Sequence, residues 1–216
     1  MDNFASHMFG KATKDEQAKI GMRDRFEHIY RNRLTDGLQA EAIAFIESRT
    51  SFYIASIVDT GWPYIQHRGG PAGFLKVIDT DTLGFADYHG NQQFITTGNL
   101  ATEDRVSLIL MDYPRRARLK LIGHATMIPA DQDQTLAKTL AQDGQGPVER
   151  LLTIKITAQD WNCPKYIEPR FTEPEIASML GPKMSELNDQ IGALADRLTE
   201  LGEDPAKILQ SAKTKS

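Results

Sequence analysis

Two segments of the chain combine side chains and glycines that suit the binding of a flat, anionic molecule. Arg68 is followed by Gly69 and Gly70, and the missing side chains let a planar group approach the backbone. The segment Gly90-Asn91-Gln92-Gln93 offers amide side chains and backbone N–H groups at the start of a helical connection, where anions bind well. Taken by itself, the second segment is equally compatible with an ordinary polar turn.

Four further side chains have chemistry to offer. Arg118 and Lys120 are two residues apart, so they share one face of an extended segment. They either contact an anionic ligand or lie as solvated surface charges, which is the common fate of such residues. Histidine is the residue type whose charge changes near neutral pH, so His67 and His89 are candidates for proton transfer, although each also suits an ordinary packing position. We assign no catalytic residue from these patterns.

The elements that must position these residues are mostly strands. Short apolar or β-branched segments separated by turns predict a closed or nearly closed antiparallel β-barrel, mainly β with flanking helices, in the α+β class. Val106 to Met111 is apolar on both faces, which predicts a strand buried on both sides. Thr35 or Asp36 is expected to cap the helix that follows it. The expected strands are 51–58, 63–68, 74–78, 82–86, 106–111, 118–128 and 150–158, and the expected helices are 15–32, 38–49, 131–142 and 173–201, with a short helical connection at 92–102.

We divide the chain into three parts: an N-terminal helical arm at 1–35, a barrel domain at 36–171 and a C-terminal helical extension at 172–216. The extension has an apolar seam of about two and a half heptads. The seam packs either on a partner or on its own subunit, and the pattern leaves both open. Its residues are Met184, Leu187, Ile191, Leu194, Leu198 and Leu201.

Composition excludes several classes of function. The net charge of -4 argues against general nucleic-acid binding, which needs a basic surface. We expect a cytoplasmic protein without membrane contact, because the sequence has no secretory signal pattern and no apolar run of ~20 residues. The single cysteine, Cys163, cannot form an internal disulfide. No pair of histidines has the spacing of metal ligands, so no metal site is expected.

Three segments carry a resemblance to a known family: Gly61-Trp-Pro-Tyr-Ile-Gln-His-Arg-Gly-Gly, Asp87-Tyr-His-Gly-Asn-Gln-Gln and Leu119-Lys-Leu-Ile-Gly-His-Ala. Together they resemble the FMN-binding split β-barrel of the pyridoxamine 5'-phosphate oxidase-like family, over about residues 40–171. The segment that begins Trp161-Asn-Cys-Pro is similar to a Trp-Asn-Cys-Pro-Gln-His-Ile motif of a bacterial subgroup. The resemblance implies FMN as the cofactor and a homodimer with FMN at the subunit interface.

The resemblance also implies a set of cofactor-binding residues. The chain departs from the family pattern at Gln92 and Gln93, which replace basic residues often found there. Phosphate binding would therefore depend more heavily on Arg68 and Lys120. The residues that the resemblance assigns to FMN binding are Gln66, His67, Arg68, Gly69, Asp87, Tyr88, Asn91, Gln92, Arg118 and Lys120.

The function implied by the resemblance is that of an FMN-dependent oxidoreductase with an unidentified small-molecule substrate or electron donor. True pyridoxamine 5'-phosphate oxidase activity is disfavoured, because the chain ends in a polar, leucine-rich helix and lacks the arginine and histidine arrangement that grips the substrate phosphate. Two alternatives stay open. One is a non-catalytic flavin-binding protein, and the other is a related barrel that binds heme or a deazaflavin.

Overall fold

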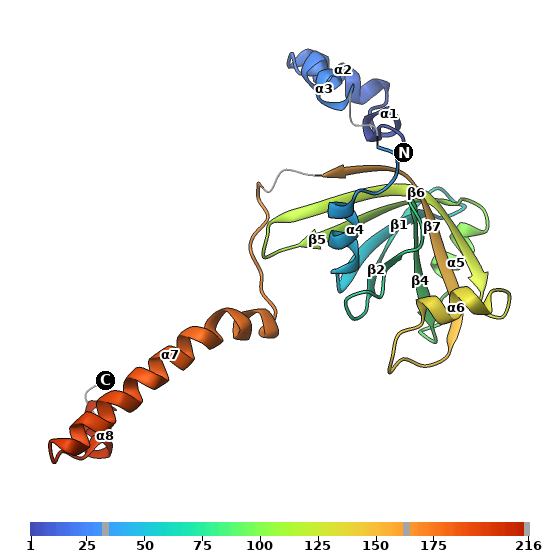
Figure 1. Ribbon diagram of the computed structural model, residues 1–216. Coiled ribbons are helices and arrows are strands. Elements are labelled where there is room, and N and C mark those ends of the chain that lie inside the picture. The colour runs from blue at the N-terminus through green and yellow to red at the C-terminus, as the bar shows by residue number, and fades with distance from the viewer. Residues whose placement is uncertain (32–34, 162–164, 214–216) are drawn as a thin grey trace. The chain divides into compact units, whose positions relative to one another are not determined.

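The computed structural model of the 216-residue chain describes residues 1–31, 35–161 and 165–213. Met1–Glu168 form one compact unit, and the segment from Pro169 onward forms a second. The first unit contains α1 to α6 and all of the strands, and the second contains α7 and α8 (Figure 1). The elements are α1 (Phe4–Met8), α2 (Lys11–Lys19), α3 (Arg23–Arg31), α4 (Ala40–Glu47), β1 (Ser51–Ile57), β2 (Pro63–Gly69), β3 (Lys76–Val77), β4 (Thr82–Tyr88), α5 (Ile95–Leu100), β5 (Arg105–Asp112), β6 (Ala117–Pro129), α6 (Gln134–Leu140), β7 (Val148–Trp161), α7 (Glu173–Glu200) and α8 (Pro205–Lys213).

The strands form one antiparallel sheet in the order β2-β1-β5-β6-β7-β4-β3. The predicted mainly-β class with flanking helices is therefore confirmed. The sheet curls, and α6 lies beside β4 and β7 (Figure 1). β2 and β3 are its two edges. Among the described residues no backbone ladder joins these edges, and side chains such as Arg68, which donates to Asp87, bridge the gap between β2 and β4.

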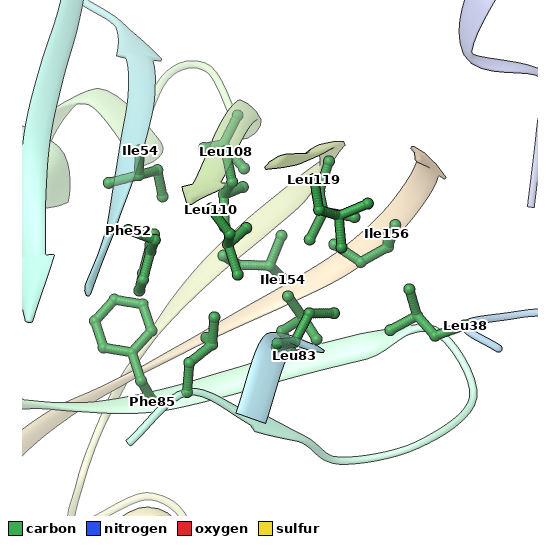
Figure 2. Packing of buried hydrophobic residues seen from close by; sticks show 14 of the residues in the cluster. Leu38, Phe52, Ile54, Leu83, Phe85, Leu108, Leu110, Leu119, Ile154 and Ile156 are labelled. Atoms are coloured by element: carbon green, nitrogen blue, oxygen red, sulfur yellow. The ribbon is translucent and has the colours of Figure 1, made fainter. Parts of the chain in front are cut away.

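The core lies inside the curl. Ala42, Phe45 and Ile46 recur at helical spacing and place one apolar face of α4 in this core, as the sequence predicts. Leu38, which precedes the helix, is buried in the same core. Figure 2 shows Phe52 and Phe85 from β1 and β4 packed together with leucines and isoleucines of β4, β5, β6 and β7. The rings of Phe52 and Phe85 meet edge to face with centroids 5.4 Å apart, a favoured aromatic geometry.

Three local expectations need correction. β5 is not buried on both sides: Val106, Leu108 and Leu110 are buried, but the alternate residues face outward and Ser107 is exposed, because only one face of a barrel wall meets the core. Gln39 occupies the N-cap of α4 and makes no side-chain cap. The expected helix at 15–32 is two helices, separated where Gly21 adopts a φ of 68°; its residue 32 lies outside the described residues.

A β-bulge lies where β6 pairs with β7. The register shifts between Ile122 and Gly123, and a Cβ at position 123 would clash with the backbone carbonyl of Lys155. Glycine is therefore required here by close backbone approach. The bulge leaves the alternation of β6 intact relative to β5, so Arg118, Lys120, Ile122 and His124 share one face of the sheet, as predicted.

Candidate functional site

A cavity of about 230 Å³ opens between β2, the end of β4, the start of β7 and the loop that leads into α5. β2 alternates between partly buried and exposed residues, so its even-numbered side chains all point toward this first cavity. Its lining residues are Tyr64, Gln66, Arg68, Asp87, Tyr88, Gly90, Asn91, Gln92, Gln93, Phe94, Ile95, Thr96, Thr97 and Arg150.

Three charged side chains at the wall of the first cavity form what we call the Asp87 cluster. Arg68 Nη1 donates to Asp87 Oδ1 at 2.7 Å, and Arg150 Nε donates to Asp87 Oδ2 at 2.9 Å. All three side chains are largely buried, with 19%, 11% and 20% of the surface of Arg68, Asp87 and Arg150 exposed. Two guanidinium groups thus share one carboxylate. Arg150 also pairs with a second carboxylate, since its Nη2 lies 3.1 Å from Glu149 Oε2.

The strand register explains the Asp87 cluster. Asp87 and Arg150 are direct partners in the β4–β7 ladder, where opposite charges on facing residues stabilise a sheet. Arg68 reaches them from β2, a strand at the opposite edge of the sheet. The cluster therefore links two parts of the barrel, β2 on one side and the β4–β7 pair on the other, which form no backbone ladder with each other among the described residues.

One polar atom of the Asp87 cluster has no protein partner. Arg68 Nε is buried and makes no hydrogen bond. A buried N–H without an acceptor is unfavourable by about 1–3 kcal/mol, and most such groups in proteins have a partner. An acceptor atom of a bound ligand would supply that partner.

The loop before α5 has an unusual backbone. Gln92 and Phe94 adopt φ values of 55° and 51°, in the left-handed region that residues other than glycine seldom occupy. Such conformations concentrate at ligand-binding sites. The Thr96 hydroxyl donates to Gln66 Oε1 at 2.7 Å, which fixes the loop against β2, and Phe94 stacks on the Arg150 guanidinium at 4.9 Å.

A second cavity of about 180 Å³ adjoins the first. It shares Arg68, Asp87 and Tyr88 with the first cavity and adds Gly69 together with the phenyl rings of Phe74 and Phe85. A polar cavity and a partly aromatic one thus lie next to each other along the Asp87 cluster. The residues unique to the second cavity are Gly69, Gly70, Pro71, Phe74, Phe85, Ala86, Gln142 and Gln145.

Gly70 has a structural role as well. A Cβ at this position would lie 2.7 Å from Phe74 Cβ and Cγ, so the glycine makes room for the Phe74 ring. That ring stacks on Phe52 with centroids 5.7 Å apart. Access of a flat ligand to the backbone is therefore not needed to explain Gly70, although both Gly69 and Gly70 line the second cavity.

Seven of the ten residues assigned from the sequence line one of the two cavities, and three do not. His67 lies on the opposite face of β2, where its ring meets Tyr53 at 5.4 Å. Lys120 approaches the Phe4 ring at 5.7 Å and Asp160 at 3.9 Å, on the outside of the sheet. Arg118 shares that face of β6. Within a single chain, these three side chains do not meet the Asp87 cluster.

The second histidine proposed for proton transfer, His89, also lies outside both linings. Its Nδ1 is 2.7 Å from Glu149 Oε1, and two-thirds of its side chain is exposed. Tyr88 lines both cavities instead, with a hydroxyl oxygen that accepts a hydrogen bond from the Gln142 backbone N–H at 2.7 Å.

Arg150 is the most important residue that sequence reasoning missed. It begins the expected closing strand at 150–158, and its only signal is a basic residue at the start of a strand that returns to the barrel. Its role requires the β4–β7 register that places it opposite Asp87, and pairing between such distant segments cannot be derived from spacing. Thr96, which also lines the first cavity, carries no distinctive motif, and Tyr64 lies in the segment 61–70 that carries the resemblance but was not assigned to the site.

The strongest resolved pKa shift belongs to a group outside both cavities. Glu103 accepts hydrogen bonds from the Arg105 side chain and backbone, and these lower the pKa of its carboxyl to about 2. The guanidinium of Arg105 has a raised pKa for the same reason. This pair ties down the turn between α5 and β5.

A model of the pyridoxamine 5'-phosphate oxidase family matches residues 38–161, which is more than half of the 216 residues. The chain belongs to this family. The match includes both cavities and the whole sheet, and it confirms the resemblance recognised in the sequence. The family's split-barrel fold agrees with an antiparallel sheet that side chains close between its edges. Of the Trp-Asn-Cys-Pro segment, residues 162–164 lie outside the described residues, so assignment to a bacterial subgroup of the family stays a prediction.

Several solved structures resemble the chain at low sequence identity. HupZ from Group A Streptococcus has 16% identity and a TM-score of 0.49, with 62% of this chain and 99% of that chain covered. General stress protein 26 from Bacillus anthracis has 13% identity and a TM-score of 0.43, with 60% and 92% covered. An FMN-binding protein from Syntrophomonas wolfei has 12% identity and a TM-score of 0.42, with 68% and 97% covered. Among curated proteins no match was found.

Two further properties concern metals and membranes. Across the described ranges, no three histidine, cysteine, aspartate or glutamate side chains gather as they would around a metal ion. In the same part of the chain, no helix combines the length and apolar character needed to span a bilayer.

Proposed function

We propose that the protein is an FMN-binding flavoprotein and an FMN-dependent oxidoreductase that acts on a small molecule. The observation that carries the proposal is the Asp87 cluster, with its partnerless Arg68 Nε, beside a left-handed loop in a member of this family. Phosphate groups are bound best by arginine, whose N–H groups match their geometry. The cluster supplies two arginines for one carboxylate.

The residues around the two cavities fit the parts of FMN. A phosphate needs cationic donors, which Arg68 and Arg150 supply in the first cavity. The ribityl hydroxyls and the polar ring edge need hydrogen-bonding groups, which Gln66, Asn91 and Gln92 supply. A flavin ring needs an apolar slot, and the second cavity offers the phenyl rings of Phe74 and Phe85.

In this proposal the chain binds and orients the cofactor, while the flavin, when bound, supplies hydride or electron transfer. Arg68 and Arg150 hold the phosphate, and Asp87 keeps both guanidinium groups in place. Tyr88, which borders both cavities, is positioned to donate its hydroxyl proton in a hydrogen bond to a bound ring. Gln92 and Gln93 contribute neutral amides in place of basic residues, so the two arginines provide the cationic contacts within one chain.

We also propose a homodimer in which both subunits line each site. The outside of β1, β2, β5 and β6 is apolar and partly open, with 67% of Ile65 and 40% of Tyr53 exposed, and it borders a cavity of about 390 Å³ that Phe4 and Met8 also line. Apolar surface of this kind marks an interface. A symmetric partner would cover it and bring its own Lys120 and Arg118 toward the neighbouring site. The oligomeric state of the purified protein tests this arrangement.

The decisive experiment is the visible absorption spectrum of the purified protein, followed by mass analysis of any chromophore released on denaturation. A flavin spectrum and released FMN would support the proposal, and oxidation of reduced nicotinamide would then support turnover. Bound flavin without turnover would favour the non-catalytic alternative. A heme or deazaflavin mass would refute FMN as the cofactor, and so would a colourless protein that fails to bind added FMN.

Arginine variants test the site itself. Arg68→Ala and Arg150→Ala should each weaken FMN binding by about 10–150-fold, which corresponds to the ~1.5–3 kcal/mol of a charge-assisted hydrogen bond. Lys155→Ala is the matched control, since it removes a cation from β7 that lines neither cavity. Equal FMN affinity in all three variants and the wild type would overturn the assignment of the Asp87 cluster.

A further inference from the structure

The C-terminal helix α7 carries a longer apolar seam than the region from Met184 to Leu201 suggests. The same heptad register continues backward to Ala177, so it extends through four heptads, which is the length typical of a coiled coil. At 1.5 Å per residue the seam runs for about 36 Å. The d positions are Leu180, Leu187, Leu194 and Leu201, and the a positions are Ala177, Met184, Ile191 and Leu198.

Most of this seam is uncovered in the C-terminal unit, whereas Leu198 near its end is half-buried and α8 contacts α7. The four d-position leucines expose 55%, 40%, 65% and 64% of their surface, in sequence order. No residue of α7 is buried. The helix also contains Gly181, Pro182 and Gly192, and glycine and proline are the weakest helix formers. A helix of this composition is stabilised mainly by packing of its apolar face.

We propose that α7 pairs with α7 of a second copy of this chain, as a parallel two-stranded coiled coil. Leucine at every d position, with Ile191 at a central a position, is the combination that favours two parallel strands. Small or neutral residues flank the seam at the e positions, so this row places no charge beside the partner helix. These e residues are Gly181, Asn188, Ala195 and Gly202.

The charges beside the seam favour the parallel orientation, although Lys183 and Arg197 also pair with Glu186 and Glu200 of their own helix. The g positions include Lys183, Gln190 and Arg197. In a parallel pair each g residue faces the e residue five positions later in the partner, and all of these e residues are neutral. In a fully overlapping antiparallel pair, g residues face g residues, so Lys183 would lie opposite Arg197 of the other helix. Like charges at these positions oppose pairing.

A second copy is the partner that this surface fits without further assumptions. Two identical seams satisfy each other under twofold symmetry, because every a or d residue meets its own equivalent. The apolar residues then leave water together. This contact uses no residue of the sheet and no residue that lines the two cavities, so it does not depend on cofactor binding.

Intermolecular distances between spin labels, measured on the associated protein in solution, test the proposal. Ser178, Ser185 and Thr199 all occupy b positions away from the seam, and each can be replaced by cysteine in a full-length Cys163→Ser background. In the parallel pair, identical residues lie at the same level, so the three intermolecular distances should be equal and short. In an antiparallel pair the labels at 178 and 199 would lie about 30 Å or more apart along the axis, and those at 185 about 12 Å.

A seam variant separates this contact from association through the sheet. Leu194→Glu should abolish the common short distance, because it places a carboxylate in the seam, whereas Ala193→Glu on the exposed flank should preserve it. Flavin content measured on the same samples should be unchanged in both variants. Unequal or long distances in the parent, or short distances that survive Leu194→Glu, would overturn the proposal whether or not the protein binds FMN.

Discussion

Replacement of Asp87 by asparagine tests the reasoning about the Asp87 cluster most directly. The substitution keeps the shape of the side chain but removes the charge that holds Arg68 and Arg150, which are each about one-fifth exposed. Removal of one partner from a buried ion pair destabilises a protein by about 3–5 kcal/mol. Glu149 still compensates Arg150 from 3.1 Å, so we expect the lower end of this range, about 3 kcal/mol.

Urea denaturation of Asp87→Asn and the wild type would measure this difference in the free energy of unfolding. For a domain of this size, the same change should lower Tm by about 6–12 °C, at roughly 2–4 °C per kcal/mol. Asp104→Asn is the control, because Asp104 pairs with His124 at an exposed position and such pairs contribute about 0–1 kcal/mol. A loss below about 1 kcal/mol for Asp87→Asn would refute the conclusion that the cluster joins the two parts of the barrel.

Inorganic phosphate adds a second readout to the same variant. Asp87→Asn leaves two guanidinium groups without their shared carboxylate, and an anion that binds the folded state stabilises it by mass action. Phosphate should therefore raise the Tm of Asp87→Asn more than that of the wild type. An equal rise in both proteins would argue against an anion site at these arginines.

Three further predictions concern parts of the first unit outside the cluster. The Glu103 carboxyl should titrate at about pH 2 when followed by NMR, and Arg105→Ala should return its pKa toward 4.5. Because the pKa of Glu103 is lowered in the folded state, the stability that its charged form contributes is present above about pH 4.5 and is lost as the pH falls toward 2. Gly123→Ala should reduce the free energy of unfolding by about 1–3 kcal/mol through overpacking, whereas Gly98→Ala, in the open on α5, should be neutral or stabilising by about 0.4–1 kcal/mol. Phe52→Ala should reduce the free energy of unfolding by about 3–5 kcal/mol, because Phe52 is only 1% exposed; a loss below about 1 kcal/mol would contradict its central place in the core.

Local sequence patterns predicted helices, strands and turns well where the residue type or the apolar spacing favours one backbone conformation. Gly61 has the positive φ of 87° expected of the turn between β1 and β2. The apolar spacing from Leu38 to Ile46 identified the buried face of α4. The five-residue helix α1 was missed, because it is too short for any helical period to appear in the sequence.

Structural features that depend on the pairing of strands far apart in the sequence were harder to predict. The apolar run in β5 could not reveal which of its faces would remain outside the barrel. Arg150 gains its partner only through a register with β4. The motif at Lys120 was recognised by resemblance, but its position relative to the first cavity depends on how the sheet curves. Sequence reasoning therefore assigned six of the fourteen residues that line the first cavity and missed Arg150, one of its two arginines.

The strand order also has a consequence for how the protein folds. β1 can pair at once with β2, but its other side must wait for β5, since Phe52 pairs with Leu110. β4 has only the two-residue β3 as a nearby partner until β7 arrives, since Thr82 pairs with Lys155. Contacts between segments so far apart form slowly. During synthesis, Arg68 and Asp87 leave the ribosome long before Arg150. The two arginines can meet their shared carboxylate only after the last strand has been made, so a ligand that needs both could stabilise the finished domain but could not guide its early assembly.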